Sequence, residues 1–219
     1  MKYLHLTFVI CLLVITAAGG VGCAKTVTSI VPYGEQITVA ATLRGAVDVA
    51  NNRYFLVLSN SSSYKVPLPR PDIIEATPEF IEPGLTPIVG TAEAYYSAFF
   101  STWSSYFVID SGGYTLVKGP FSSSTVATRE VIANLDEATT TLNFTCQLSR
   151  IFGSVPDQIY FDFVAVPWPA AEQTIPADHL PSIDNYISSI QGSIAKVTDS
   201  TDSDLDPGLD ILSLQVEIQ

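Results

Sequence analysis

The chain has 219 residues, of which 47% are hydrophobic and only 15% are charged, so it holds enough apolar material for a folded core. The formal net charge of -12 argues against binding to nucleic acid, or to anionic lipid through basic side chains. With 2 histidines and 3 cysteines, the composition excludes a tetrahedral zinc site, an iron–sulfur cluster and an attached haem. These residues are His5, His179, Cys11, Cys23 and Cys146.

The N-terminal segment has the three-part layout of a secretory signal. A basic residue is followed by an apolar run, residues 6–18, and then by small residues ahead of Cys23. The run is shorter than the roughly 20 residues that a membrane-spanning helix needs, which favours cleavage over a permanent helical anchor. We therefore expect residues 1–22 to be a signal peptide, residues 23–35 a tether, and residues 36–219 one folded domain of an exported protein.

The end of this leader resembles the lipobox of prokaryotic lipoproteins. In that motif a small residue precedes a cysteine that is lipidated and becomes the first residue of the mature chain, and Val21-Gly22-Cys23 has this arrangement. Gly20 occupies the position where the motif usually has an aliphatic residue. The resemblance implies an anchor in the membrane of the cell envelope through lipid on Cys23, with the protein outward-facing or periplasmic. Ordinary cleavage that leaves Cys23 as a thiol is the alternative.

The first part of the domain predicts two strands and a long loop. Residues 36–44 alternate between apolar and polar side chains, which is typical of a half-buried strand. Residues 54–58 are apolar on both faces, as in a central strand, and the Asn51-Asn52 turn before them suggests that the two strands are neighbours. Prolines recur over residues 65–87, and each removes a backbone donor, so a long loop is expected there. This loop is either a binding rim or a packing insertion.

An aromatic block, residues 95–107, leads into the clearest hairpin signal in the chain. Residues 106–109 and 114–117 are rich in aromatic and β-branched side chains and flank Asp110-Ser111-Gly112-Gly113. Glycine tolerates the positive φ that tight hairpin turns require. We therefore predict a central hairpin over residues 103–117, whereas residues 95–102 fit either a strand extension or a short helical turn.

Further strands are predicted in the second half of the chain from alternation of apolar and polar side chains. They cover residues 125–135, 142–148, 159–165 and 212–218. This pattern points Cys146 inward, where a lone cysteine packs as a small apolar side chain. A reactive thiol is the alternative for Cys146.

Helical patterns are rare in this sequence. Ile183, Ile187 and Ile190 recur at helical spacing and predict a helix over residues 182–192, and a single helical turn is expected at residues 150–152. Strands dominate, and they do not alternate with helices as in a parallel sheet. The sequence thus predicts an all-β fold, an antiparallel β-sandwich with a long Pro-rich loop and at most one or two short helices.

Five aspartates gather just before the last predicted strand. They are Asp199, Asp202, Asp204, Asp206 and Asp210. Carboxylates at alternating positions can wrap around Ca²⁺, which takes about six to eight oxygen ligands. Pro207 and Ser213 occupy the positions where an EF-hand loop has glycine and glutamate. The segment is therefore either a calcium site or a solvated acidic loop, and no other cofactor is indicated.

The order of elements in the last third of the chain carries a second resemblance. The inward-facing strand over residues 142–148, a short turn, a strand from Ile159, and an acidic loop leading to Leu209-Asp210-Ile211 are similar to family-nine carbohydrate-binding modules and related DOMON-like sandwiches. The resemblance implies a β-sandwich and a sugar ligand. Trp103 and Trp168 are then the candidate stacking residues, and burial of both in the core is the alternative.

The sequence does not indicate an enzyme. A Ser-His-Asp arrangement would depend on His179, which lacks a nucleophile elbow beside it, and no carboxylate pair can be assigned to hydrolysis. We predict a non-catalytic binding or structural module, held at the membrane by its N-terminal lipid, with an envelope protein or a glycan as partner. The alternatives are a carbohydrate-binding module with structural calcium and a carboxylate-based hydrolase.

Overall fold

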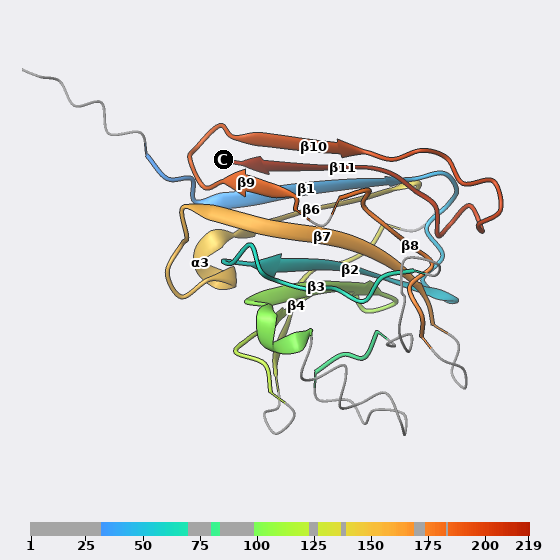
Figure 1. The fold of residues 1–219 in the computed structure, drawn as a ribbon, viewed down its shortest axis with the longest axis horizontal. Helices are drawn as coiled ribbons and strands as arrows, with labels where there is room; N and C mark the ends of the chain where they lie inside the picture. Colours follow the sequence, from blue (N-terminus) through green and yellow to red (C-terminus); the bar gives the residue numbers. More distant parts are fainter. Residues whose placement is uncertain are drawn as a thin grey trace, which may run out of the picture. The chain divides into compact units, whose positions relative to one another are not determined.

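Two antiparallel β-sheets make up the fold of this computed structural model, which confirms the predicted all-β sandwich (Figure 1). The four-stranded sheet contains, in spatial order, β10 (Ile194–Thr198), β11 (Ile211–Ile218), β1 (Gln36–Leu43) and β6 (Thr141–Gln147). The seven-stranded sheet contains, in order, β5 (Thr128–Ala133), β4 (Gly113–Lys118), β3 (Ser105–Asp110), β2 (Asn52–Ser59), β7 (Gln158–Pro167) and β8 (Asp178–His179), and β9 (Tyr186–Ser188) also pairs with β7.

The structure describes residues 32–69, 80–83, 99–122, 127–136, 139–168, 174–182 and 184–219. All of them belong to one compact unit, Pro32–Gln219. The predicted signal peptide and Cys23 lie outside these residues, as do parts of the Pro-rich loop and of the aromatic block. Backbone pairing begins before Gln36, because Gly34 N–H donates to Ser189 O at 2.8 Å, so the described end of the predicted tether is docked on the domain.

Helical structure in the described residues is confined to two short pieces. One is α3 (Leu148–Ile151), close to the predicted helical turn, and the other is the 3-10 turn η1 (Phe100–Thr102) in the aromatic block. No helix within the described ranges is long and apolar enough to cross a membrane.

The predicted helix over residues 182–192 is wrong, because β9 occupies this segment. Ile187 is buried at 3% exposure while Ile190 is 39% exposed, so the isoleucines do not share one apolar face. β-branched side chains also favour the extended backbone of a strand, and pairing with β7 satisfies that preference.

Strand partners differ from those expected from chain order. β1 and β2 were predicted to be neighbours, but they lie in different sheets, and β1 pairs instead with β11 and β6. In the same way β6 and β7 follow each other in the chain and belong to opposite sheets. An alternating pattern identifies the buried face of a strand, but it does not identify the strand beside it.

The central hairpin is confirmed as β3 and β4. Asp110 pairs with Gly113 at its tip, and Gly112 N–H donates to Asp110 Oδ1 at 2.8 Å. Gly113 has a φ of 95°, and a Cβ there would lie 2.4 Å from Ala133 O. Both the backbone angle and this close approach to β5 therefore require glycine.

The inner core lies between the two sheets. It takes alternate side chains from the four-stranded sheet and from one face of the seven-stranded sheet; among them are Ile37, Val39, Leu56, Phe107, Phe144, Phe163 and Val216. Cys146 belongs to this core and is 3% exposed, so its predicted inward orientation is confirmed, and burial raises the pKa of its thiol.

An outer core covers the opposite face of the seven-stranded sheet. Its strand residues include Phe55, Val57, Tyr106, Val108 and Val164, and its cover includes Tyr64, Val66, Phe80, Phe100 and Trp103 from the loops. The predicted Pro-rich loop contributes residues 65–69 and 80–83, which form neither helix nor strand. Because both faces of the sheet are buried, its central strands are apolar on both sides.

A buried ion cluster joins this loop cover to the sheet. Glu82 is 1% exposed, and its two carboxylate oxygens lie 2.7 Å from Arg53 Nη1 and 2.6 Å from Arg129 Nη1. Tyr106 donates its hydroxyl to Glu82 at 3.3 Å, and the guanidinium of Arg53 lies 4.3 Å from the ring centre of Trp168. The loop is thus attached to β2, β3 and β5 through one carboxylate.

Candidate functional site

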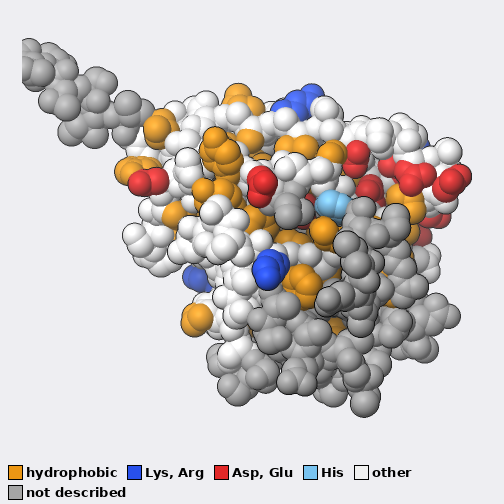
Figure 2. Space-filling view, in the orientation of Figure 1, with side chains coloured by type: hydrophobic (Ala, Val, Ile, Leu, Met, Phe, Trp, Pro, Cys, Tyr) orange, Lys and Arg blue, Asp and Glu red, His pale blue; other side chains and the backbone are white. Residues whose placement is uncertain are grey.

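The five aspartates predicted as a calcium site lie in the loop between β10 and β11. Acidic side chains gather at that end of the domain in Figure 2. Arg44, just after β1, enters the loop, where its guanidinium pairs with Asp210 and donates to the carbonyl oxygen of Asp202 at 3.0 Å. A cation from the protein itself therefore neutralises the buried carboxylate of Asp210.

Of the other four aspartates, Asp199, Asp202 and Asp206 accept backbone N–H groups within the loop, and Asp204 is exposed. Asp202 Oδ1 accepts the N–H of Asp204 at 2.9 Å, and Asp206 Oδ1 accepts the N–H of Gly208 at 2.8 Å. Within the described ranges, no three His, Cys, Asp or Glu side chains are placed to hold a metal ion. These contacts favour the solvated acidic loop, and calcium binding stays a prediction.

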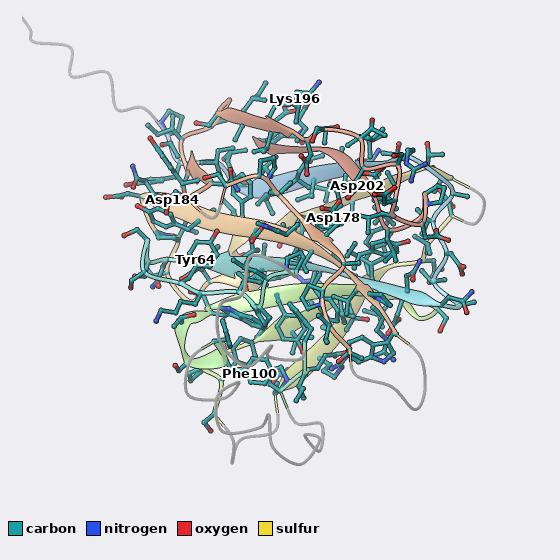
Figure 3. All side chains as sticks on the ribbon, turned by 45° about the vertical axis from the view of Figure 1, so that its right-hand side comes forward. Tyr64, Phe100, Asp178, Asp184, Lys196 and Asp202 are labelled. Atoms are coloured by element: carbon teal, nitrogen blue, oxygen red, sulfur yellow. The ribbon has the colours of Figure 1, made fainter. Side chains whose placement is uncertain are left out.

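A second acidic group lies beside this loop, where Figure 3 shows Asp178 near Asp202. Asp178 accepts the N–H of Ile211 at 2.7 Å and its neighbour's N–H at 2.9 Å, so it joins β8 of one sheet to β11 of the other. Burial raises the pKa of Asp178 to about 6, with nearby acidic side chains adding to the effect.

Asp162, on β7, is fully buried, and burial raises the pKa of its carboxyl well above the usual value. His179 Nδ1 lies 3.9 Å from Asp162 Oδ2, and the other carboxyl oxygen accepts the N–H of Phe163 at 2.8 Å. His179, the residue on which a catalytic triad would depend, therefore faces a buried carboxyl inside the sheet.

The two tryptophans predicted as sugar-stacking residues are occupied by packing. Trp103 is 4% exposed, with ring centres of Phe80 and Phe100 at 5.6 and 5.1 Å, and its indole N–H donates to Lys65 O at 2.7 Å. Trp168 packs on Phe55 at 5.7 Å and carries an arginine over its ring. Of the two readings of Trp103, the structure shows burial in the core, and Trp168 packs against the outer core.

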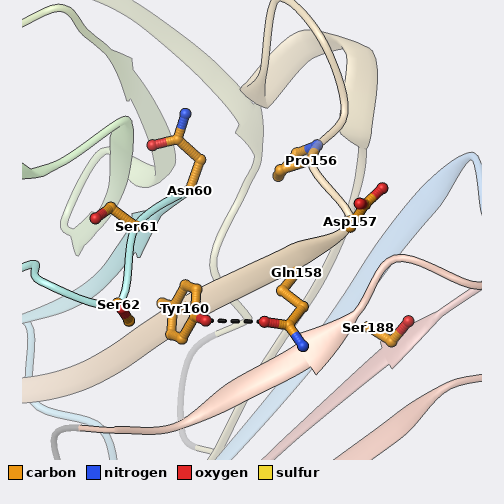
Figure 4. Close-up of a pocket in the computed structure, with 8 residues that line it drawn as sticks. All are labelled: Asn60, Ser61, Ser62, Pro156, Asp157, Gln158, Tyr160 and Ser188. Atoms are coloured by element: carbon orange, nitrogen blue, oxygen red, sulfur yellow. Dashed lines mark hydrogen bonds between the residues drawn. The ribbon is translucent and has the colours of Figure 1, made fainter.

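An open, polar hollow of about 650 Å³ lies where β2 ends and β7 begins (Figure 4). Three segments surround it: the turn after β2, the loop before β7, and β9. Its lining residues are Asn60, Ser61, Ser62, Pro156, Asp157, Gln158, Tyr160 and Ser188. This volume is within the range of about 300–1,000 Å³ that is common for small-molecule sites.

Strand register builds the floor of this hollow. Gln158 pairs with Ser188, and Tyr160 pairs with Tyr186, across β7 and β9. Alternate residues of a strand face the same side, and the intervening Ile159 belongs to the inner core. The two cross-strand pairs therefore project together from the outer face of the sheet.

Tyr160, which lines the hollow, is the middle ring of a row of three tyrosines, and Tyr64 and Tyr186 each pack against it outside the lining. Ring centres of Tyr64 and Tyr160 are 6.4 Å apart, and those of Tyr160 and Tyr186 are 5.8 Å apart. Tyr64 is 5% exposed and donates its hydroxyl to Phe161 O at 2.7 Å, whereas Tyr186 is 54% exposed. The row is anchored at its buried end and open to solvent at the other.

Polar groups border the tyrosine row. Tyr160 donates its hydroxyl to Gln158 Oε1 at 2.8 Å, which orients the amide of Gln158. The backbone N–H of Asn60 donates to Ser104 Oγ at 3.1 Å, whereas the side-chain amide N–H groups of Asn60 and Gln158 make no hydrogen bond within the part of the chain that the structure describes. Asp157 accepts the hydroxyl of Tyr33, and this hydrogen bond raises the pKa of Tyr33. The hollow therefore offers amide donors and a carboxylate beside aromatic faces.

Sequence reasoning missed this hollow. The available signal was the outward pair Gln158 and Tyr160 in a strand whose other face is apolar, but Tyr186 lay in a segment predicted to be helical. No protein-family model, curated protein or solved structure matches the chain. The function must therefore be inferred from the chemistry of the described residues.

Proposed function

We propose that this protein is an exported, lipid-anchored, non-catalytic binding module of the cell envelope, and that the polar hollow holds its ligand. The hollow itself carries the binding part of the proposal. Its aromatic lining residue, Tyr160, lies on β7, which is paired with β9, and packs against the buried Tyr64, so ligand binding would cost little ordering of that ring.

The lining chemistry supports binding over hydrolysis. Of the lining residues that the structure describes, Asp157 alone is a carboxylate. Hydrolysis of glycosidic bonds commonly needs two carboxyl groups that flank the scissile bond. The raised pKa values of Asp162 and Asp178 follow from burial within the sandwich, and neither residue lines the hollow.

The leader motif supports the anchoring part of the proposal. A chain spans at most about 3.6 Å per residue, so the segment from Cys23 to Pro32 reaches no further than about 33 Å. Tyr33 follows directly and contacts Asp157 at the hollow. With lipid on Cys23, the hollow would stay close to the membrane surface and meet ligands of the envelope.

Fractionation of cells that produce the full chain tests this proposal. We expect the wild-type protein in the membrane fraction, with a mature N-terminus at Cys23 that carries acyl mass in mass spectrometry. The Cys23→Ser variant should appear in the soluble exported fraction. A wild-type N-terminus at another residue, or one without acyl mass, would refute the anchoring.

A further inference from the structure

We infer that the hollow binds a neutral glycan that stacks on Tyr160 in its lining and extends onto the exposed neighbouring ring of Tyr186, with the side-chain amides of Asn60 and Gln158 as partners for sugar hydroxyls. This inference rests on the proposed binding function, because it assigns the class of ligand to the same site. The residues involved are different from the tryptophans that the sequence resemblance suggested.

The tyrosine pair provides the apolar part of recognition. Sugar rings present C–H groups on their faces and hydroxyls at their edges, so they require an aromatic surface that has polar groups beside it. Tyr186 is 54% exposed, and its ring is inclined by 43° to that of Tyr160. The two rings therefore form a shallow, angled surface rather than a closed slot, which suits a chain of sugar units lying across it.

The polar rim matches hydroxyl groups. An amide side chain has two donor hydrogens and one acceptor oxygen in a plane, and a hydroxyl can donate and accept. Asn60, Gln158 and Ser188 supply such groups around the rings. The hydrogen bond from Tyr160 occupies Gln158 Oε1, so the side-chain N–H groups of Gln158 are the donors available to a ligand. A ligand with many hydroxyls would pair with several of these groups at once.

Charge excludes acidic ligands from the hollow. Among the described residues that line the hollow there is no Lys or Arg, and Asp157 contributes a carboxylate. The whole chain has a formal net charge of -12, which repels anions at longer range. A phosphate, sulfate or uronate group would therefore lie beside a negative charge with no basic partner among the described lining residues, which favours a neutral sugar chain.

The experiment uses the mature full-length protein in detergent, with soluble xylan, mannan, β-glucan and chitooligosaccharides as neutral probes, and alginate as the anionic one. We expect measurable binding to at least one neutral probe and none to alginate. Tyr186→Ala should weaken that binding about tenfold or more, because it removes the exposed stacking ring. Tyr186→Phe should retain it, since the ring remains.

Val131→Ala is the matched control. Val131 is 58% exposed on β5, at the opposite edge of the same sheet, so its truncation should leave binding unchanged. Equal thermal melting of the Tyr186 variants and the wild type would show that folding is intact. Equal binding by Tyr186→Ala and Val131→Ala would overturn the proposed site.

A binding assay with poly-L-proline distinguishes the glycan inference from the broader proposal of a binding module, because proline-rich peptides also dock on aromatic surfaces. Binding of poly-L-proline through Tyr186, with no binding of neutral glycans, would overturn the glycan inference and retain a binding module. Absence of binding to every neutral probe likewise overturns the inference. Glycan binding by a protein that fails the Cys23 acylation test would instead refute the anchoring alone.

Discussion

The two faces of the seven-stranded sheet are buried in different ways. The inner face is covered by a second sheet, and its contacts come from alternate residues of paired strands. The outer face is covered by loop segments, aromatic rings and one buried carboxylate, Glu82. A sheet can bury another sheet through a simple alternating pattern, whereas irregular chain has to satisfy its polar groups one by one.

The largest expected loss of folding stability comes from a substitution in the inner core. Phe163→Ala should lower the free energy of unfolding by about 3–5 kcal/mol, because opposed strands cannot collapse into the cavity. Phe55→Ala in the outer core should cost less, about 3 kcal/mol at the lower end of this range, since loop segments can move into the space. Chemical denaturation of both variants measures the difference, and equal losses would show that the loop cover is as rigid as the second sheet.

The next largest loss of stability is expected from a change to Glu82, the carboxylate that holds the loop cover on the sheet. Glu82→Gln keeps the shape of the side chain but removes its charge, and should cost about 1–3 kcal/mol because Arg53 and Arg129 lose their shared partner. Glu130→Gln is the control, since the Glu130–Arg150 pair is largely exposed and worth less than about 1 kcal/mol. Similar losses in the two variants, measured by denaturation, would argue against a special role for Glu82.

A smaller, pH-dependent change in folding stability is expected from Asp178, which joins β8 to β11. Asp178 has a pKa of about 6 in the folded protein against a usual value of 3.8, so the folded state holds this proton more tightly than the unfolded state. Its contribution to stability should therefore increase as the pH falls from about 6.5 to 4 and decrease as the pH rises through 6. Melting temperatures across this range should show a weaker trend in Asp178→Asn than in the wild type; parallel trends would contradict the assignment.

The smallest effect is expected from calcium at the loop between β10 and β11. Arg44 already neutralises Asp210, and the neighbouring aspartates hold backbone turns. Millimolar Ca²⁺ should therefore leave the melting temperature of the wild type unchanged. A clear rise that disappears in Asp202→Asn would establish the calcium site that the spacing of the aspartates suggests.

Local pattern was sufficient for most strands and for the central hairpin. The alternation over residues 36–44 and 142–148 placed β1 and β6 almost to the residue, and Gly112-Gly113 marked the turn between β3 and β4. These features depend on neighbours within a few positions, where side-chain period and turn chemistry dominate. The short strands β8 and β10 were missed, because two to five residues carry little periodic signal.

The sequence by itself determined the fold class, the inward position of Cys146 and the scarcity of cysteine and histidine, with 3 and 2 of them in the chain. Only the tertiary structure decided which strands are neighbours, that Trp103 is buried, and that Tyr186 lies beside Tyr160. The physical reason is distance along the chain: alternation reports which face of a strand is buried, but pairing partners and loop cover depend on contacts between remote segments. The hollow is likewise a product of the tertiary structure, since it exists only where β7 and β9 are in register.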